Sequence, residues 1–77
     1  LKVCARQAEY FRTLPLHASQ KESERNAEYS IFNYHLTPNY DFIHDILYYA
    51  DDVEVLEPVK LRDSIIQLLE RTITKYN

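Results

Sequence analysis

Glycine is absent from all 77 residues of this chain, and its absence restricts the backbone more than any other feature. Glycine supplies the positive-φ positions of tight turns, so two-residue hairpin loops are disfavoured here. Strands should instead be joined by longer connections or by turns that use Asn and Asp. Loops that wrap a phosphate, of the P-loop or dinucleotide-binding type, also require glycine and are therefore excluded.

The length predicts one small domain, and the only cysteine is Cys4. A single thiol forms no internal disulfide and is typical of a reducing compartment, so we expect a cytoplasmic protein. The longest apolar runs are a few residues, which predicts no membrane-spanning segment. The chain begins at Leu1 with a strand-like pattern, and we expect residues 1–77 to form a single domain from a longer protein.

Charge is distributed unevenly along the chain. Residues 26–59 contain seven acidic side chains and neither lysine nor arginine, whereas the flanking segments are slightly basic. Because nucleic-acid affinity depends on neutralising phosphates, this acidic middle makes strong autonomous binding of DNA or RNA unfavourable. Any such contact should use a local basic patch, for which the candidates are Lys2, Arg6, Arg12 and Lys60.

Hydrophobic periodicity predicts the order β-α-β-β-α-β followed by one more helix. The expected strands are residues 1–6, 16–20, 28–37 and 53–55, with a loop over 21–27. The expected helices are residues 7–14, a helix capped by Thr37 or Asn39 that ends near 49, and a last helix opening at 57–58. We therefore predict an α+β fold class, a ferredoxin-like β-α-β-β-α-β sandwich with an additional C-terminal helix.

Alternation within the strands predicts which side chains face the helices. That inner face should carry Val3, Ala5, Leu16, Ala18, Phe32, Tyr34, Leu36, Val53 and Val55. The opposite, open face should carry Tyr29 and Ile31, which are candidate interface residues because they are larger and more apolar than a solvated face usually shows. The last helix should bury an apolar stripe on its own sheet or on another chain, formed by Leu61, Ile65, Leu68, Leu69, Ile73 and Tyr76.

No group of residues predicts catalysis, a cofactor or a metal site. His17 and His35 could lie on neighbouring strands, but no acidic residue at a suitable spacing completes a set of metal ligands. Cys4 with a histidine has no visible oxyanion hole, and the paired residues 51–52 lie where aspartate commonly forms turns. We therefore expect a non-enzymatic protein without a cofactor.

Two segments resemble a known family. Residues 15–20 (PLHASQ) resemble the PLHxSQ segment of WYL-domain regulators, and residues 52–62 (DVEVLEPVKLR) resemble the VEVLEPxxLR segment before their last helix. The strand and the Pro-Xaa-Tyr-Asp-Phe-Ile helix between them follow in the family's order. The chain thus resembles the C-terminal extension (WCX) domain of WYL-domain-containing bacterial transcriptional regulators. One departure is Ala50, which together with residues 51–52 stands where the family usually places a glycine.

The resemblance implies an accessory regulatory and dimerisation domain that couples effector sensing to DNA binding carried by other domains. Such regulators typically have an N-terminal winged helix-turn-helix and a central WYL domain, and neither lies within this chain. The resemblance therefore implies a C-terminal fragment of a larger regulator. Its implied partners are a second copy of itself and the WYL domain of the same or a partner chain, with a nucleotide or nucleic acid as effector of the full-length protein.

Four positions fall on the family motifs and are candidates for polar contacts with an effector or a neighbouring domain: His17, Ser19, Gln20 and Arg62. The alternative for the first three is that their side chains only pin the adjacent loop. For Arg62 the alternative is a surface ion pair with Glu57 or Asp63, which would contribute little. A different function for the whole chain is a ferredoxin-like sensor module that itself binds a small molecule or single-stranded nucleic acid.

Overall fold

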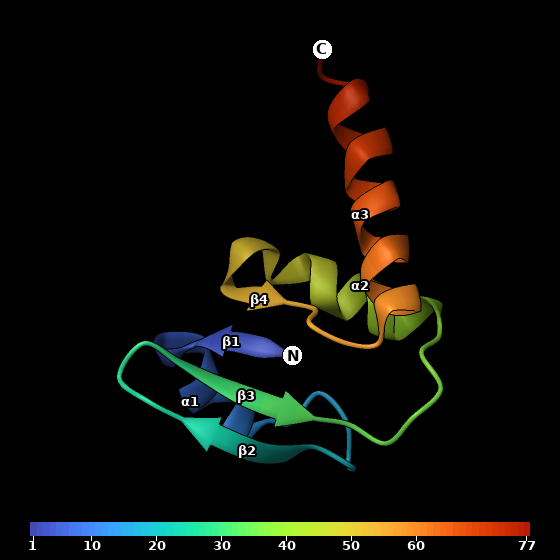
Figure 1. Cartoon of the computed structure of the whole chain (residues 1–77). Helices are drawn as coiled ribbons and strands as arrows, with labels where there is room; N and C mark the ends of the chain where they lie inside the picture. The colour runs from blue at the N-terminus through green and yellow to red at the C-terminus, as the bar shows by residue number, and fades with distance from the viewer.

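The computed structural model describes all 77 residues, and a four-stranded antiparallel sheet with helices on one face forms its body (Figure 1). The strand order is β2-β3-β1-β4, so β1 and β3 are central. The predicted α+β class is confirmed. In chain order the elements are β1 (Lys2–Cys4), α1 (Ala5–Thr13), β2 (Lys21–Arg25), β3 (Tyr29–Asn33), α2 (Tyr40–Tyr48), the 3-10 turn η1 (Ala50–Asp52), β4 (Val53–Glu54) and α3 (Val59–Thr74).

The hydrophobic core lies between the sheet and the helices α1 and α2. Phe11 of α1 and Phe32 of β3 are each 1% exposed, and their rings meet edge to face with centroids 5.8 Å apart. Phe42 and Ile46 of α2 are buried in the same cluster. Alternation correctly predicts the core side of the other strands, since the same cluster contains Val3, Phe32, Val53 and Val55, with Tyr34 and Leu36 packed partly buried against it. Leu16 also packs there, but from a turn, and the predicted strand residue Ala5 lies in α1.

The second predicted strand is wrong. Residues 16–20 form a turn, and the edge strand β2 lies in the segment that was expected to be a loop. All five residues of β2 are exposed, so no apolar alternation marks the strand in the sequence. Its backbone pairs with β3, with a register shift between Glu22 and Glu24. The predicted inner-face residue Ala18 is accordingly exposed in the turn.

The ends of other predicted strands differ from the observed ones where the local sequence is compatible with more than one kind of secondary structure. The strand expected over residues 1–6 ends at Cys4, because α1 begins directly at Ala5 with residues that are good helix formers. The strand expected over 28–37 is regular only to Asn33. The predicted cap of α2 is confirmed at Asn39, whose side-chain oxygen accepts a hydrogen bond from the Phe42 N–H at 2.9 Å.

Ala50 has a backbone φ of 51°, which lies in the left-handed region. It stands close to the position at which the family that the chain resembles usually has a glycine. A Cβ atom disfavours this conformation, so we expect Ala50→Gly to raise the free energy of unfolding by about 1 kcal/mol. Equilibrium urea unfolding measures the change. The matched control is Ala18→Gly, at an exposed residue with negative φ, which should lower stability slightly. A destabilised Ala50→Gly variant would contradict the expectation.

Candidate functional site

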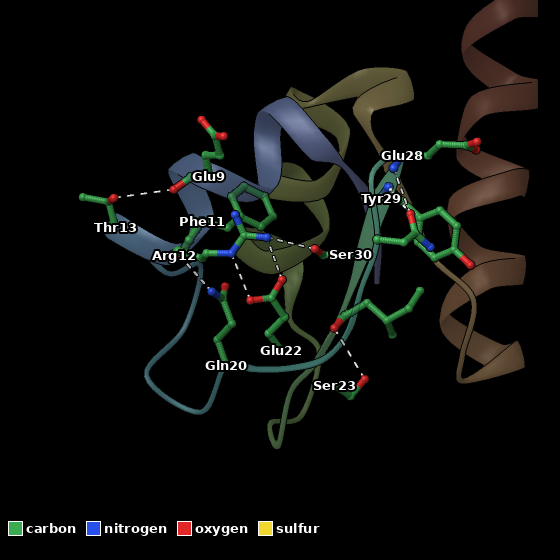
Figure 2. Close-up of polar contacts among 12 residues, drawn as sticks. Glu9, Phe11, Arg12, Thr13, Gln20, Glu22, Ser23, Glu28, Tyr29 and Ser30 are labelled. Carbon is green, nitrogen blue, oxygen red and sulfur yellow. Dashed lines mark hydrogen bonds and ion pairs between the residues drawn. The ribbon is translucent and has the colours of Figure 1, made fainter.

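Gln20 holds the turn between α1 and β2 through three hydrogen bonds. Its Oε1 accepts from the Leu16 N–H at 3.1 Å and from the Tyr34 hydroxyl at 2.6 Å. Its Nε2 donates to the Phe11 carbonyl at 2.8 Å, one of the helix-end carbonyls that lack an intrahelical partner (Figure 2). Burial of the Tyr34 hydroxyl raises the pKa of that group. Gln20 therefore ties together α1, the turn and the segment after β3.

Ser19 and His17 complete the same turn. The Ser19 hydroxyl accepts a hydrogen bond from the His35 N–H at 2.9 Å. His17 Nδ1 accepts from the Ser19 N–H at 3.0 Å and lies 2.8 Å from the Ser19 hydroxyl. Because a backbone N–H can only donate, Nδ1 is the acceptor in the bond with the Ser19 N–H. The structure thus gathers His17, Ser19 and Gln20 around one turn, and only His17 is exposed among the three.

An ion pair beside this turn joins α1 to β2. Arg12 donates from Nε and Nη2 to the two carboxylate oxygens of Glu22 at 2.9 and 2.7 Å (Figure 2). The same Nη2 donates to the Ser30 hydroxyl at 3.0 Å, and Ser30 is the one buried polar side chain of the chain. Hydrogen bonds from Arg12, and secondarily Ser30, hold the pKa of Glu22 at about 2. Sequence reasoning missed this pair, because Arg12 and Glu22 lie ten residues apart with no local pattern linking them.

The low pKa of Glu22 predicts a contribution to stability that depends on pH. Its ordinary pKa is 4.5 and its folded pKa about 2, so the folded state favours the ionised form. The contribution is therefore fully present above about pH 4.5 and is lost as the pH falls towards 2. We expect the difference in free energy of unfolding between the wild type and Glu22→Gln to shrink over this interval in urea titrations.

The control for this pH dependence is Glu70→Gln, at an exposed carboxylate of α3 that makes no ion pair within the chain. Its difference from the wild type should stay nearly constant between pH 2 and pH 4.5, the interval set by the two pKa values of Glu22. A Glu22→Gln difference that is equally constant would contradict the role given to Arg12.

The open face of the sheet carries a small apolar patch formed by Tyr29 and Ile31, both half-buried. The Tyr29 hydroxyl donates to Glu24 at 3.0 Å, and Lys2 Nζ lies 4.6 Å from the centre of the Tyr29 ring. In the sheet register, Ile31 has Lys2 on one side and Glu24 on the other. The predicted neighbours on the open face are therefore brought together, with a cation and an anion at their borders.

The candidate basic patch is largely engaged in contacts within the chain. Arg6 lies 3.6 Å from a carboxylate oxygen of Asp52, and Arg12 is paired with Glu22. Lys2 lies over the Tyr29 ring. Three of the four candidate cations therefore have partners, which disfavours their use as free phosphate contacts.

The helix α3 packs on the core through its first two turns only. Leu61 and Ile65 are each 8% exposed, whereas Leu69 is 51%, Ile73 60% and Tyr76 84% exposed. In Figure 1 the outer half of α3, coloured red, extends beyond the sheet and α2 with no element beside it. The predicted apolar stripe is thus divided between a buried base and an exposed end.

Arg62 makes an ion pair, but the predicted partners are wrong. Its Nη1 lies 3.4 Å from Glu54 Oε2 and donates to the Val55 carbonyl at 2.9 Å, so neither Glu57 nor Asp63 is the partner. The reason is that the loop after β4 turns directly into α3 and leaves the Val55 carbonyl within reach of the guanidinium. Arg62 therefore fastens α3 to the end of β4.

No three His, Cys, Asp or Glu side chains come together in a way that could hold a metal ion. His44 instead packs against Tyr40, with ring centroids 4.1 Å apart. Among the helices, none combines the length and apolar character needed to cross a lipid bilayer.

The fold and these surfaces define a small α+β domain with its candidate functional side chains on one turn, one open sheet face and one projecting helix. The family model described as the WCX domain matches residues 1–73, and the chain belongs to this family. The resemblance found in the two sequence motifs is thereby confirmed. No curated protein and no solved structure matches the chain.

Proposed function

We propose that this chain is the non-enzymatic accessory domain of a WYL-type transcriptional regulator. It contributes to dimerisation and couples effector sensing to DNA binding that other domains carry, in the cytoplasm. The observation that carries the proposal is the WCX match over residues 1–73. The two unpartnered apolar surfaces support it, because a domain that transmits a signal between other domains must offer surfaces for contact.

The open-face patch is the surface that we assign to the WYL domain. Tyr29 and Ile31 provide a small apolar centre, and Lys2 and Glu24 provide a charged border. An apolar centre with a polar rim is the usual anatomy of a protein interface. The exposed ring of His17 is the member of the PLHxSQ turn available for a contact with the effector or the neighbouring domain.

We also infer that the sheet belongs to the ferredoxin-like class. The inference is supported by the element order β1-α1-β2-β3-α2-β4, by antiparallel pairing of every neighbouring strand pair, and by the central position of β1 and β3. In such a sandwich both helices cover one face, so the other face stays available to a partner.

The proposed contact is tested by isothermal titration calorimetry of this chain with the separately purified WYL domain of its regulator. Ile31→Glu should weaken binding about 10-fold or more, because burying an isoleucine side chain contributes about 1.5–3 kcal/mol. Thr13→Glu is the matched control, since it adds the same charge at an exposed residue of α1, on the other side of the sheet. Undiminished binding by Ile31→Glu would refute the assigned surface, and no binding by the wild type would refute the interdomain role.

A second candidate function is direct sensing of a small molecule. A groove of about 410 Å³ lies between the segment after β3, the start of α2 and the base of α3, and its lining includes Tyr34, Leu36 and Phe42. This volume is at the lower end of the range for ligand pockets. A ligand bound here must raise the midpoint of thermal unfolding. Each nucleotide and amino acid of a panel is added at about 100 times the weakest Kd at which a sensor would still respond. If none of them raises the midpoint of thermal unfolding, this candidate function is contradicted.

A further inference from the structure

The exposed end of α3 presents a continuous apolar stripe. Ile66, Leu69 and Ile73 are spaced by three and four residues, which places them along one side of α3, and Tyr76 follows three residues later in the turn after the helix. Their exposure rises along the helix from 39% at Ile66 to 84% at Tyr76. We call this set the outer stripe. The side chains of this stripe make few contacts with the core of the domain. Their exposed apolar area can therefore be buried against another surface, which would be favourable.

The base of the outer stripe adjoins a groove on the same molecule. This groove, of about 520 Å³, lies between α2, β4 and α3, and we call it the α2–α3 groove. Leu69 belongs both to the outer stripe and to the wall of the groove, so the two features form one surface. The remaining apolar lining is Ile46, Leu47, Ala50, Val53 and Ile65, and the polar lining is Asp51 and Glu54.

The two features have opposite charge. The polar side chains of the groove are both acidic; Glu54 is paired with Arg62, whereas Asp51 makes no ion pair within the chain and supplies the free negative charge. Residues 71–77, which are the last turn of α3 and the chain end that follows it, carry Arg71 and Lys75 and no acidic side chain. Neither cation has an ion-pair partner in the chain. An apolar projection with a positive end therefore lies next to an apolar groove with a negative border.

We propose that the α2–α3 groove and the outer stripe are the two halves of a self-complementary interface, and that a second copy of this chain occupies them. The two α3 helices cross in opposite directions near Leu69 and Ile73. The helix continues for five residues beyond Leu69, about 7–8 Å, and Tyr76 follows in the next turn, so each copy places Tyr76 against the groove of the other. Because the two copies are related by a two-fold axis, the stripe and the groove of each copy are both occupied. This inference rests on the dimerisation that belongs to the proposed function, and it identifies the surface used for it.

The test is sedimentation equilibrium of the 77-residue chain over a concentration series. We expect a monomer–dimer equilibrium in which Ile73→Glu raises the dissociation constant at least about 100-fold, because each dimer loses two buried isoleucines. Ile73 is 60% exposed in the single chain, so the variant should fold, as checked by circular dichroism. Gln67→Glu is the matched control, since it adds the same charge at an exposed residue on the polar side of α3.

A charge exchange tests the orientation of the two copies. Lys75→Glu and Asp51→Lys should each weaken the dimer about threefold, as expected for exposed ion pairs, and the double variant should recover most of the loss. Failure of the double variant to recover would overturn the proposed orientation.

The other outcomes separate this inference from the proposed function. A chain that stays monomeric at the highest concentration overturns both the interface and the dimerisation role. A dimer that survives Ile73→Glu but dissociates with Ile31→Glu overturns the α3 interface and leaves the dimerisation role in place through the open face of the sheet.

Discussion

Phe11→Ala is expected to lower the free energy of unfolding by about 3–5 kcal/mol, the cost of removing a buried phenylalanine side chain. Phe11 is 1% exposed, and its ring packs edge to face on Phe32 at 5.8 Å and on Tyr49 at 5.1 Å. One substitution thus removes the contact between α1, β3 and the end of α2. A domain of this size has a total stability of only about 4–12 kcal/mol. Urea unfolding followed by circular dichroism should therefore show a much lower midpoint, and a chain already unfolded without urea if the wild-type stability is at the lower end of that range.

Tyr10→Ala is the matched control for Phe11→Ala. Tyr10 is the preceding residue of α1 and is 63% exposed, so its removal changes helix propensity and little else. We expect its effect to stay within about 0.5 kcal/mol, as is usual for surface substitutions. Equal losses for the two variants would show that the core does not lie between α1 and the sheet.

Gln20→Ala is expected to cost about 2–3 kcal/mol, because it leaves several partly buried polar groups without partners. The groups affected are the Leu16 N–H, the Phe11 carbonyl and the Tyr34 hydroxyl. The measurement is urea unfolding of Gln20→Ala, Tyr34→Phe and the double variant. Because the Tyr34 hydroxyl bonds to Gln20 at 2.6 Å, the double variant should cost less than the sum of the two single ones.

The same experiment decides what the PLHxSQ turn does in this chain. Gln67→Ala is the control, at an exposed glutamine that makes no side-chain hydrogen bond within the chain, and it should change stability little. If Gln20 serves only to contact an effector, Gln20→Ala will unfold at the same urea concentration as the wild type. That result would refute the structural role given to Gln20.

The parts of the fold that the sequence predicts are those with a local cause. Alternation identifies Val3, Phe32, Val53 and Val55 as core residues, because each must point to the side where the helices lie. Asn39 caps α2 because a short polar side chain before a helix can accept a hydrogen bond from a free N–H of its first turn. The placement of Tyr29 and Ile31 side by side on the open face follows from the same alternation.

The parts that it does not predict depend on groups distant in the chain. The strand β2 is held by backbone pairing with β3 and has no buried side chain, so its polar sequence resembles a loop. Arg12 finds Glu22 only after α1 and β2 have packed. Arg62 donates to the Glu54 carboxylate and to the Val55 carbonyl, because the path of the loop after β4, and not distance in the sequence, decides which acceptors lie within its reach.

The register shift in β2 has a consequence for how the length of this domain can vary. Glu22 pairs with Phe32 and reaches Arg12 on the helix side, whereas Glu24 pairs with Ile31 and reaches Tyr29 on the other side. Residues two apart in a regular strand would share a face, so Ser23 is the extra residue that separates them. Deleting Ser23 would make the two glutamates adjacent and keep each on its own side. This is therefore a position where related chains can differ by one residue without moving any contact of the core.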